Sequence, residues 1–236
     1  MVMPVLRAIL VVAAVRQEID RSGFRSDRDV KTLFTGMGAK NALGSVRKSL
    51  AAGRYRMVIS AGFSGGTRPG LRVGDLVVAS EVIDDSSVQR WVPPPLMVDL
   101  PGSFSIGPLV TSSRAVPDPE GKAQLGARYG AVAVDMETAA VAQAASEAGL
   151  PWVSVRAILD PMEVPLTIRS RRQALYSLMN PSRWMDFSSF LGAMKTAGRS
   201  LADGLNLVVS QTELKSFHPK MIKEKTDGFR EGCHCH

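Results

Sequence analysis

Four acidic residues stand where apolar, strand-like segments end, and their side chains are the first candidates for chemistry. Asp135 and Glu137 lie in Val134-Asp135-Met136-Glu137, between an expected strand and an expected helix. Asp160 closes Arg156-Ala157-Ile158-Leu159-Asp160, and Glu18 follows the first apolar run. Because ligands of open α/β sheets bind at the carboxyl ends of strands, this placement favours a role in a ligand site.

Carboxylates in this number suit the cleavage of a bond between a sugar and a base. The ribose becomes cationic in the transition state, much as in glycoside hydrolysis. One carboxylate can offset that charge, a carboxylic acid can protonate the leaving base, and a third group can take a proton from water. Structural explanations stay open, because acidic residues are also favoured in first helical turns and in turns of the chain.

Two glycine-containing segments are candidates for holding an anion or a sugar. The first is Thr35-Gly36-Met37-Gly38-Ala39-Lys40-Asn41, between a strand and a helix. The second, Ala61-Gly62-Phe63-Ser64-Gly65-Gly66, is expected to form a loop over residues 60–66, directly after a strand. Neither has the pattern of a Walker loop or of a dinucleotide site. Each alone is as well explained by a tight turn.

Short apolar segments alternate with helical patterns along most of the chain, which predicts an α/β fold with helices on both faces of a sheet. Residues 84–106 are expected to form a long surface excursion, and residues 161–190 irregular structure and short helices beside the cleft. One domain is expected over residues 1–211, followed by a polar, flexible tail over 212–236. The expected strands are residues 5–15, 32–35, 56–60, 76–79, 132–134 and 152–158, and the expected helices are 39–53, 139–148 and about 187–209.

Composition narrows the class of protein. The chain has 236 residues, is 45% hydrophobic and carries a formal net charge of +7, which suits one large α/β domain and a preference for anionic partners. Its two cysteines, Cys233 and Cys235, lie at the C-terminus, so the body holds no disulfide and a cytoplasmic location is expected. The apolar start favours a buried strand over a secretion signal, and no membrane span is expected.

Taken together, the motifs resemble those of the purine nucleoside phosphorylase and nucleosidase superfamily. The similarity extends in order over roughly residues 5–160, and it is greatest to methylthioadenosine/S-adenosylhomocysteine nucleosidases and to hopanoid-associated phosphorylases. The matching motifs are Ala14-Val15-Arg16-Gln17-Glu18, Thr35-Gly36-Met37-Gly38, Ala61-Gly62-Phe63-Ser64-Gly65-Gly66, Val73-Gly74-Asp75-Leu76-Val77-Val78, Val134-Asp135-Met136-Glu137 and Arg156-Ala157-Ile158-Leu159-Asp160.

The resemblance implies a fold, a reaction and a role for each matching residue. The fold would be a three-layer α/β/α sandwich around a mixed, partly barrel-like sheet, assembled as a homo-oligomer. Glu137 would bind the ribose hydroxyls, Met136 would pack on the ribose, Asp160 would protonate the purine near N7, and Glu18 would position the attacking water. No metal or other cofactor is implied, with inorganic phosphate as an optional co-substrate. Further substrate contacts are expected from Asp135, Gly38, Gly62, Phe63 and Ser64.

Three departures leave the nucleophile open. Leu159 replaces the serine that precedes the catalytic aspartate in the nucleosidases, and residues 113–116 lack the aromatic side chain that stacks on the base. The arginine that binds phosphate near Ser60 in phosphorylases is missing from that stretch. Arg16, Lys40 or Ser64 are the available substitutes.

Several alternatives accompany the enzyme hypothesis. A lipid-tailed nucleoside, as in the hopanoid branch, would fit a wide entrance lined by residues 161–190, and the net charge would favour peripheral membrane contact. The same stretch equally fits core packing or a subunit contact. A non-catalytic nucleoside-binding domain on the same fold is the second hypothesis. Nucleic-acid binding is disfavoured because aromatics are sparse and no binding motif is present. The end Cys233-His234-Cys235-His236 has metal-ligand residue types, although four adjacent residues fit poorly around one tetrahedral ion.

Overall fold

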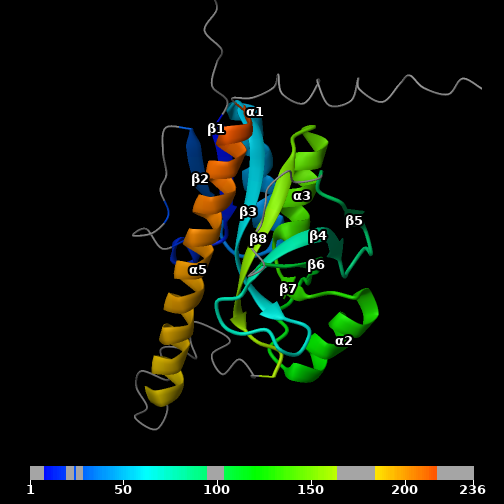
Figure 1. The fold of residues 1–236 in the computed structure, drawn as a ribbon. Coiled ribbons are helices and arrows are strands. Elements are labelled where there is room, and N and C mark those ends of the chain that lie inside the picture. Colours follow the sequence, from blue (N-terminus) through cyan, green and yellow to red (C-terminus); the bar gives the residue numbers. More distant parts are fainter. Residues whose placement is uncertain (1–7, 20–23, 25–28, 95–103, 164–183, 217–236) are drawn as a thin grey trace, which may run out of the picture.

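The computed structural model describes residues 8–19, 24, 29–94, 104–163 and 184–216 (Figure 1), with side chains described only over 188–212 in the last range. Residues 5–7, 164–183 and 217–236, on which parts of the expectations fall, lie outside the described residues. The elements are β1 (Ala8–Ala13), η1 (Arg16–Glu18), β2 (Val30–Phe34), α1 (Ala39–Ala52), β3 (Tyr55–Gly66), β4 (Leu76–Asp84), β5 (Arg90–Trp91), β6 (Phe104–Thr111), α2 (Pro119–Tyr129), β7 (Ala133–Asp135), α3 (Thr138–Glu147), β8 (Trp152–Asp160) and α5 (Trp184–Ser216).

The described strands form one mixed sheet that closes partly on itself. Eight strands run in the order β2-β1-β3-β7-β6-β4-β5, and β8 pairs with both β3 and β4. The pairing of β8 is parallel with β3 and antiparallel with β4. Strands β3, β7, β6, β4 and β8 therefore form a closed circuit, which is the partly barrel-like sheet that the resemblance implied.

Helices cover both faces of the sheet and give it three layers. In Figure 1, α5 lies along one face, and α1 and α3 lie on the other. The alternation along β1 shows why: Leu10 and Val12 pack in one core with α1 and α3, while Ile9 and Val11 pack in a second core with α5. The expected α/β/α sandwich with a central mixed sheet is confirmed, because each strand must bury both of its faces.

The segment over residues 60–66 was wrongly expected to be a loop. Strand β3 continues through Gly66, because its second half has a pairing partner on each side. Ser60 to Gly65 pair with β8, and Gly65 and Gly66 also pair with Val134 and Ala133 of β7. Small residues in this half of the strand leave space for buried polar groups of the neighbouring elements.

The expectations for the middle and the end of the chain need further correction. The excursion over residues 84–106 contains the short strand β5, and β6 begins within it at Phe104. Helix α2 had no counterpart in the sequence-based assignment. The last helix, expected over about residues 187–209, is longer at both ends, since α5 begins at Trp184 and runs to Ser216. Gly107 and Pro108 in β6 interrupt the alternation of a strand and lie opposite a register shift in β4, which explains the missed strand.

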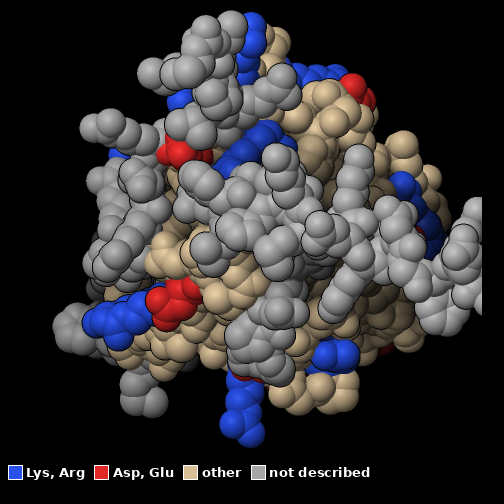
Figure 2. All heavy atoms as spheres, turned by 45° about the horizontal axis from the view of Figure 1, so that its top comes forward, with Lys and Arg blue, Asp and Glu red and all other residues tan. Residues whose placement is uncertain are grey.

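Basic side chains are dispersed over the surface that is described. On the face that Figure 2 shows, they lie in separate places among uncharged residues, and some adjoin acidic ones. The described residues on this face form no continuous basic stripe of the kind typical of nucleic-acid-binding proteins. Within the part of the chain that the structure describes, every helix is too short or too polar to cross a bilayer. Three ion pairs of the surface are Arg47–Glu147, Arg90–Glu81 and Arg128–Asp85, at 2.7, 2.7 and 3.5 Å.

We expect Leu201→Ala to weaken the attachment of α5 to the sheet. Leu201 is fully buried in the core beneath this helix. Removing a buried leucine side chain leaves a cavity, so the free energy of unfolding should fall by about 2–5 kcal/mol in urea denaturation. Leu191→Ala is the matched control, because Leu191 lies on the same helix and is 49% exposed. Equal losses in the two variants would contradict the assigned core.

Candidate active site

A cavity of about 330 Å³ opens at the carboxyl ends of the central strands. That volume is at the lower end of the range for small-molecule sites. The cavity receives residues from β3, β7, β8, η1 and α5 and from the segments before α1 and α2. Its lining residues are Ala14, Val15, Glu18, Met37, Phe63, Ser64, Gly65, Arg114, Ala115, Val116, Val134, Asp135, Met136, Glu137, Leu159, Asp160, Phe190 and Met194.

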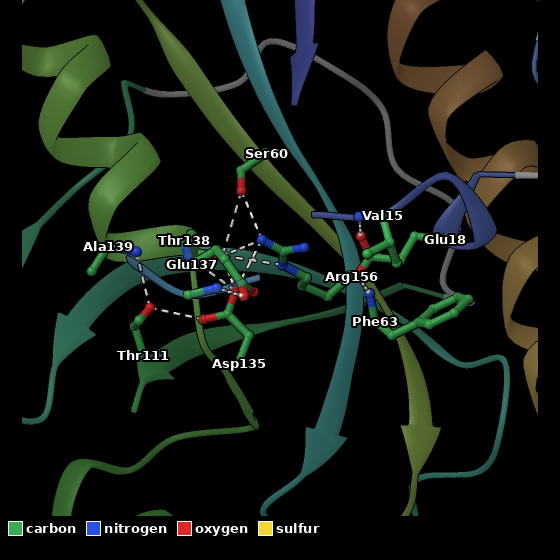
Figure 3. A network of polar contacts seen from close by, with 11 residues as sticks. Val15, Glu18, Ser60, Phe63, Thr111, Asp135, Glu137, Thr138, Ala139 and Arg156 are labelled. Atoms are coloured by element: carbon green, nitrogen blue, oxygen red, sulfur yellow. Dashed lines mark hydrogen bonds and ion pairs between the residues drawn. The ribbon is translucent and has the colours of Figure 1, made fainter. Parts of the chain in front are cut away.

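A buried ion pair adjoins this cavity, and Figure 3 shows the polar network around it. Nη2 of Arg156 lies 2.9 Å from Oδ2 of Asp135, and the two side chains are 3% and 1% exposed. The guanidinium also donates to the hydroxyls of Ser60 and Thr138. The same Asp135 oxygen accepts from the backbone N–H and the hydroxyl of Thr138. These contacts join β8, β3, β7 and the start of α3 in one network.

Gly62 makes room for this network in the centre of the sheet. It pairs with Arg156 across β3 and β8. A Cβ atom at residue 62 would lie 2.1 Å from Nη1 of Arg156 and 2.8 Å from Oε1 of Glu18. Gly62 therefore shapes the site by its missing side chain, and the guanidinium and a carboxylate occupy the space.

Glu137 is held at the first turn of α3 by a glycine from another segment. Its Oε1 accepts a 2.7 Å hydrogen bond from the backbone N–H of Gly38, whose φ of 95° favours glycine. The expected contact of Gly38 is thus to a protein carboxylate. Burial, and next the nearby charge of Asp135, raise the pKa of Glu137 to about 7.

Glu18 is buried at the end of the short helix η1. Its Oε2 accepts from the backbone N–H of Val15 at 2.9 Å, and its Oε1 accepts from that of Phe63 at 3.3 Å. Burial raises the pKa of Glu18, against the opposing charge of Arg156 and these backbone hydrogen bonds. A carboxylate with a raised pKa accepts a proton more readily than an ordinary glutamate.

Asp160 occupies the last position of β8, beside the cavity. Its Oδ2 lies 2.6 Å from Nζ of Lys122, a lysine of α2 with a fully buried side chain. Burial raises the pKa of Asp160, while the hydrogen bond and the charge of Lys122 lower it. The carboxyl group thus has a fixed partner on one oxygen.

The remaining expected contacts divide into two groups. Met136, Phe63 and Ser64 line the cavity, and the buried hydroxyl of Ser64 has no hydrogen-bond partner among the described residues. Asp135 also lines it, but both of its oxygens are bound by protein groups. No group of three or more His, Cys, Asp or Glu in the described ranges is arranged to hold a metal ion.

The two basic residues proposed as phosphate substitutes lie elsewhere. Arg16 stacks on the ring of Phe34, 5.4 Å from its centroid, and neither Arg16 nor Lys40 is among the lining residues. Arg114 lines the cavity in the stretch where a stacking aromatic was expected. An arginine from another strand does lie beside Ser60: Arg156 donates to the Ser60 hydroxyl at 2.7 Å. The contacts of its guanidinium are with protein groups.

Sequence reasoning gave no role to Arg156 or Lys122. An arginine within the apolar strand segment of β8 was a usable signal, because a buried cation requires a buried partner. The signal for Lys122 was weaker: its neighbours Gly121 and Ala123 are small, but the helix that carries all three was not expected. Thr138 and Thr111 were missed because small polar residues become significant only through what they contact.

We expect Asp135→Asn to destabilise the fold because it leaves the Arg156 cation buried without its counterion. Breaking a buried pair in this way costs about 3–5 kcal/mol of the free energy of unfolding, measured in urea. Glu147→Gln is the control, since its pair with Arg47 is about half exposed and such pairs contribute at most about 1 kcal/mol. Similar losses in both variants would count against a central role for the buried pair.

Comparison with known proteins places this architecture in a family. The model of the phosphorylase superfamily matches residues 27–177. The 5'-methylthioadenosine/S-adenosylhomocysteine nucleosidase of Exiguobacterium is 30% identical over 165 residues, which cover 58% of this chain and 70% of the relative. The enzyme of the same name from Bacillus licheniformis is 28% identical over 169 residues, covering 59% and 71%.

Solved structures share the fold at lower identity. The 5'-methylthioadenosine/S-adenosylhomocysteine nucleosidase of Neisseria meningitidis, in complex with methylthio-immucillin-A, superposes with a TM-score of 0.67 at 22% identity, covering 87% of this chain and 100% of that one. The futalosine hydrolase of Helicobacter pylori gives a TM-score of 0.60 at 17% identity, covering 87% and 98%. With the family match over most of the sheet and the acidic cavity, the chain belongs to the phosphorylase superfamily and is a nucleosidase-type enzyme.

Proposed function

We propose that this enzyme hydrolyses the N-glycosidic bond of an adenosyl-type purine nucleoside and releases the base. The observation that carries the proposal is that Glu18, Glu137 and Asp160, from three separate elements, line one cavity. Burial raises the pKa of each of these carboxyl groups. Carboxyl groups with raised pKa values are suited to taking or giving protons during turnover.

Strand β3 suggests how the substrate extends across the site. A Cβ at Gly62 would meet Glu18, and one at Gly65 would lie 3.2 and 3.3 Å from the carboxylate oxygens of Asp160. Three strand residues span roughly 10 Å. That separation fits a nucleoside with its ribose near Glu18 and its base near Asp160.

Each carboxylate then has one task in the reaction. As the bond from C1′ to the base breaks, its electron pair goes to the purine, and Asp160 donates a proton near N7. The carboxylate of Glu137 binds the ribose hydroxyls and offsets the positive charge of the sugar. Water attacks C1′ and gives its proton to Glu18. Each acid or base step contributes on the order of 10²–10⁴ to the rate. This division of work favours catalysis over a purely binding role.

Water is the nucleophile that we favour over phosphate. Four of the five charged described residues that line the cavity are acidic, with Arg114 as the exception, and we place two of the acidic ones, Glu18 and Glu137, beside the ribose. A phosphate dianion there would meet like charges in a site partly shielded from water. The buried guanidinium of Arg156 is already bound to Asp135, Ser60 and Thr138. These contacts support a reaction that needs no phosphate.

Asp160→Asn tests the proposed acid. We expect the variant to release adenine from methylthioadenosine about 10²–10⁴ times more slowly, because the amide cannot protonate the leaving base. Its affinity for adenine should stay largely unchanged. Asp203→Asn, at an exposed position of α5, is the matched control and should keep full turnover. Unchanged turnover of Asp160→Asn would remove Asp160 from the mechanism.

An apolar substituent on the 5′ carbon of the substrate is a finer proposal. Met37, Phe190 and Met194 line the cavity, and Met37 is 64% exposed. Methionine adapts to irregular apolar surfaces, which suits a flexible or bulky tail. An adenosyl hopanoid is the extreme case of such a substrate and would bring the enzyme to a lipid surface.

A series of 5′-alkylthioadenosines tests this proposal. Phe190→Ser should raise KM for the dodecyl compound about tenfold, equivalent to about 1.4 kcal/mol of lost apolar contact, and leave adenosine unaffected. Leu191→Ser, at the exposed neighbouring position, should change neither. If the dodecyl compound is not cleaved, or if both substrates are affected equally, the apolar-tail proposal fails. The homo-oligomer implied by the family stays a separate prediction.

A further inference from the structure

Lys122 is a fully buried cation next to the proposed leaving-group acid. Its Nζ lies 2.6 Å from Oδ2 of Asp160 and donates to the backbone carbonyls of Asp160 and Pro161 at 3.3 and 3.2 Å. These three partners all lie at the end of β8. A buried ammonium is stable only where opposite charge and hydrogen-bond acceptors replace water. Lys122 therefore needs Asp160 as its counterion.

Helix α2 is built to place this lysine. The carboxylate of Asp118 caps the helix by accepting from the backbone N–H of Gly121 at 2.7 Å, and Pro119 follows the cap. A Cβ at Gly126 would lie 2.2 Å from the carbonyl oxygen of Thr67, so glycine there lets α2 lie directly against the chain after β3. A Cβ at Gly65 would lie 3.4 Å from Cε of Lys122, so the lysine stem lies close to β3 at this glycine.

We propose that Lys122 is a positioning residue for proton donation to the leaving base: it holds Oδ2 of Asp160, leaves Oδ1 to face the base, and places a positive charge beside the carboxylate as it forms. This inference rests on the proposed function. In the step concerned, the bond between C1′ and the base breaks with its electron pair going to the purine. The proton on Oδ1 moves to the purine nitrogen. Asp160 becomes a carboxylate, and Lys122 keeps its proton throughout.

The positive charge of Lys122 favours proton donation by Asp160. Negative charge develops on Asp160 in the transition state, 2.6 Å from the ammonium of a fully buried lysine side chain. Such a fixed charge favours departure of the proton, because it stabilises the transition state more than the neutral acid. Consistently, burial raises the pKa of Asp160 and Lys122 lowers it. Without Lys122, the pKa of Asp160 should rise further and Asp160 should become a weaker acid.

The other charged groups of the cavity determine the acidic limb of the pH profile of kcat/KM. Apart from Lys122 on α2, the titratable or charged residues that line the cavity with Asp160 are Glu18 on η1, Asp135 on β7, Glu137 before α3 and Arg114 before α2. Glu18 and Glu137 act as ionised carboxylates, so they control the acidic limb. Asp160 acts in its protonated form and therefore controls the basic limb.

Lys122→Met tests the proposal with two substrates. Methylthioadenosine needs an acid to protonate its leaving adenine. The nitrophenolate that leaves from 4-nitrophenyl riboside is a stable anion and needs no acid. We expect kcat for methylthioadenosine to fall about 10²-fold and kcat for the nitrophenyl riboside to stay largely unchanged. The basic limb of kcat/KM for methylthioadenosine should move to higher pH. Arg128→Met, on the same helix and 63% exposed, should alter neither quantity.

Each other result has a definite meaning. Equal losses on the two substrates, with a basic limb that stays or moves to lower pH, would reduce Lys122 to a structural role and overturn the inference. Unchanged kinetics would do the same. Should Lys122→Met not fold, Lys122→Gln, which keeps two N–H donors and removes the charge, carries the same comparison. If the unaltered enzyme releases no base from any purine nucleoside, it is the proposed function that fails.

Discussion

The guanidinium of Arg156 and the carboxylate of Asp135 lie 2.9 Å apart beneath the cavity, both nearly sealed from water. A charge buried so deeply requires its partner and a full set of hydrogen bonds, and Ser60 and Thr138 supply them. Because these groups come from β8, β7, β3 and α3, the pair determines how the strand ends meet. Gly62 is part of the same constraint, since any side chain there would displace Arg156.

The proposed catalytic groups depend on that arrangement. Glu18 lies beside the space left by Gly62, and Glu137 follows Asp135 by two residues at the turn into α3. Both are held by backbone N–H groups, which fix the orientation of a carboxylate without neutralising it. Asp160 is held by a cation instead. The difference corresponds to the proposed chemistry: the first two act as carboxylates, and the third must give up a proton.

The sequence predicted the layers and the acidic residues better than the contacts between them. The alternation of apolar strand-like segments such as β1 with helical segments such as the alanine-rich α3 indicated the sandwich, because both kinds of segment reflect burial. The second half of β3 was misjudged because glycine and serine are turn residues by composition, and only its pairing with β7 and β8 makes it a strand. Lys122 was missed because local sequence does not reveal which turn of a surface-type helix faces a buried acid. Met136, Glu137 and Asp160, proposed from short motifs at strand ends, line the same cavity, and their roles stay predictions.

The most direct measurement is the identity of the sugar released in the presence of phosphate. The purified enzyme would be incubated with methylthioadenosine, with and without saturating inorganic phosphate, and the products separated and quantified. We expect adenine and free methylthioribose at a rate that phosphate does not change, because the proposed mechanism places two carboxylates of the cavity lining beside the ribose. Methylthioribose 1-phosphate as the product would contradict it, and so would the absence of adenine from every purine nucleoside tested.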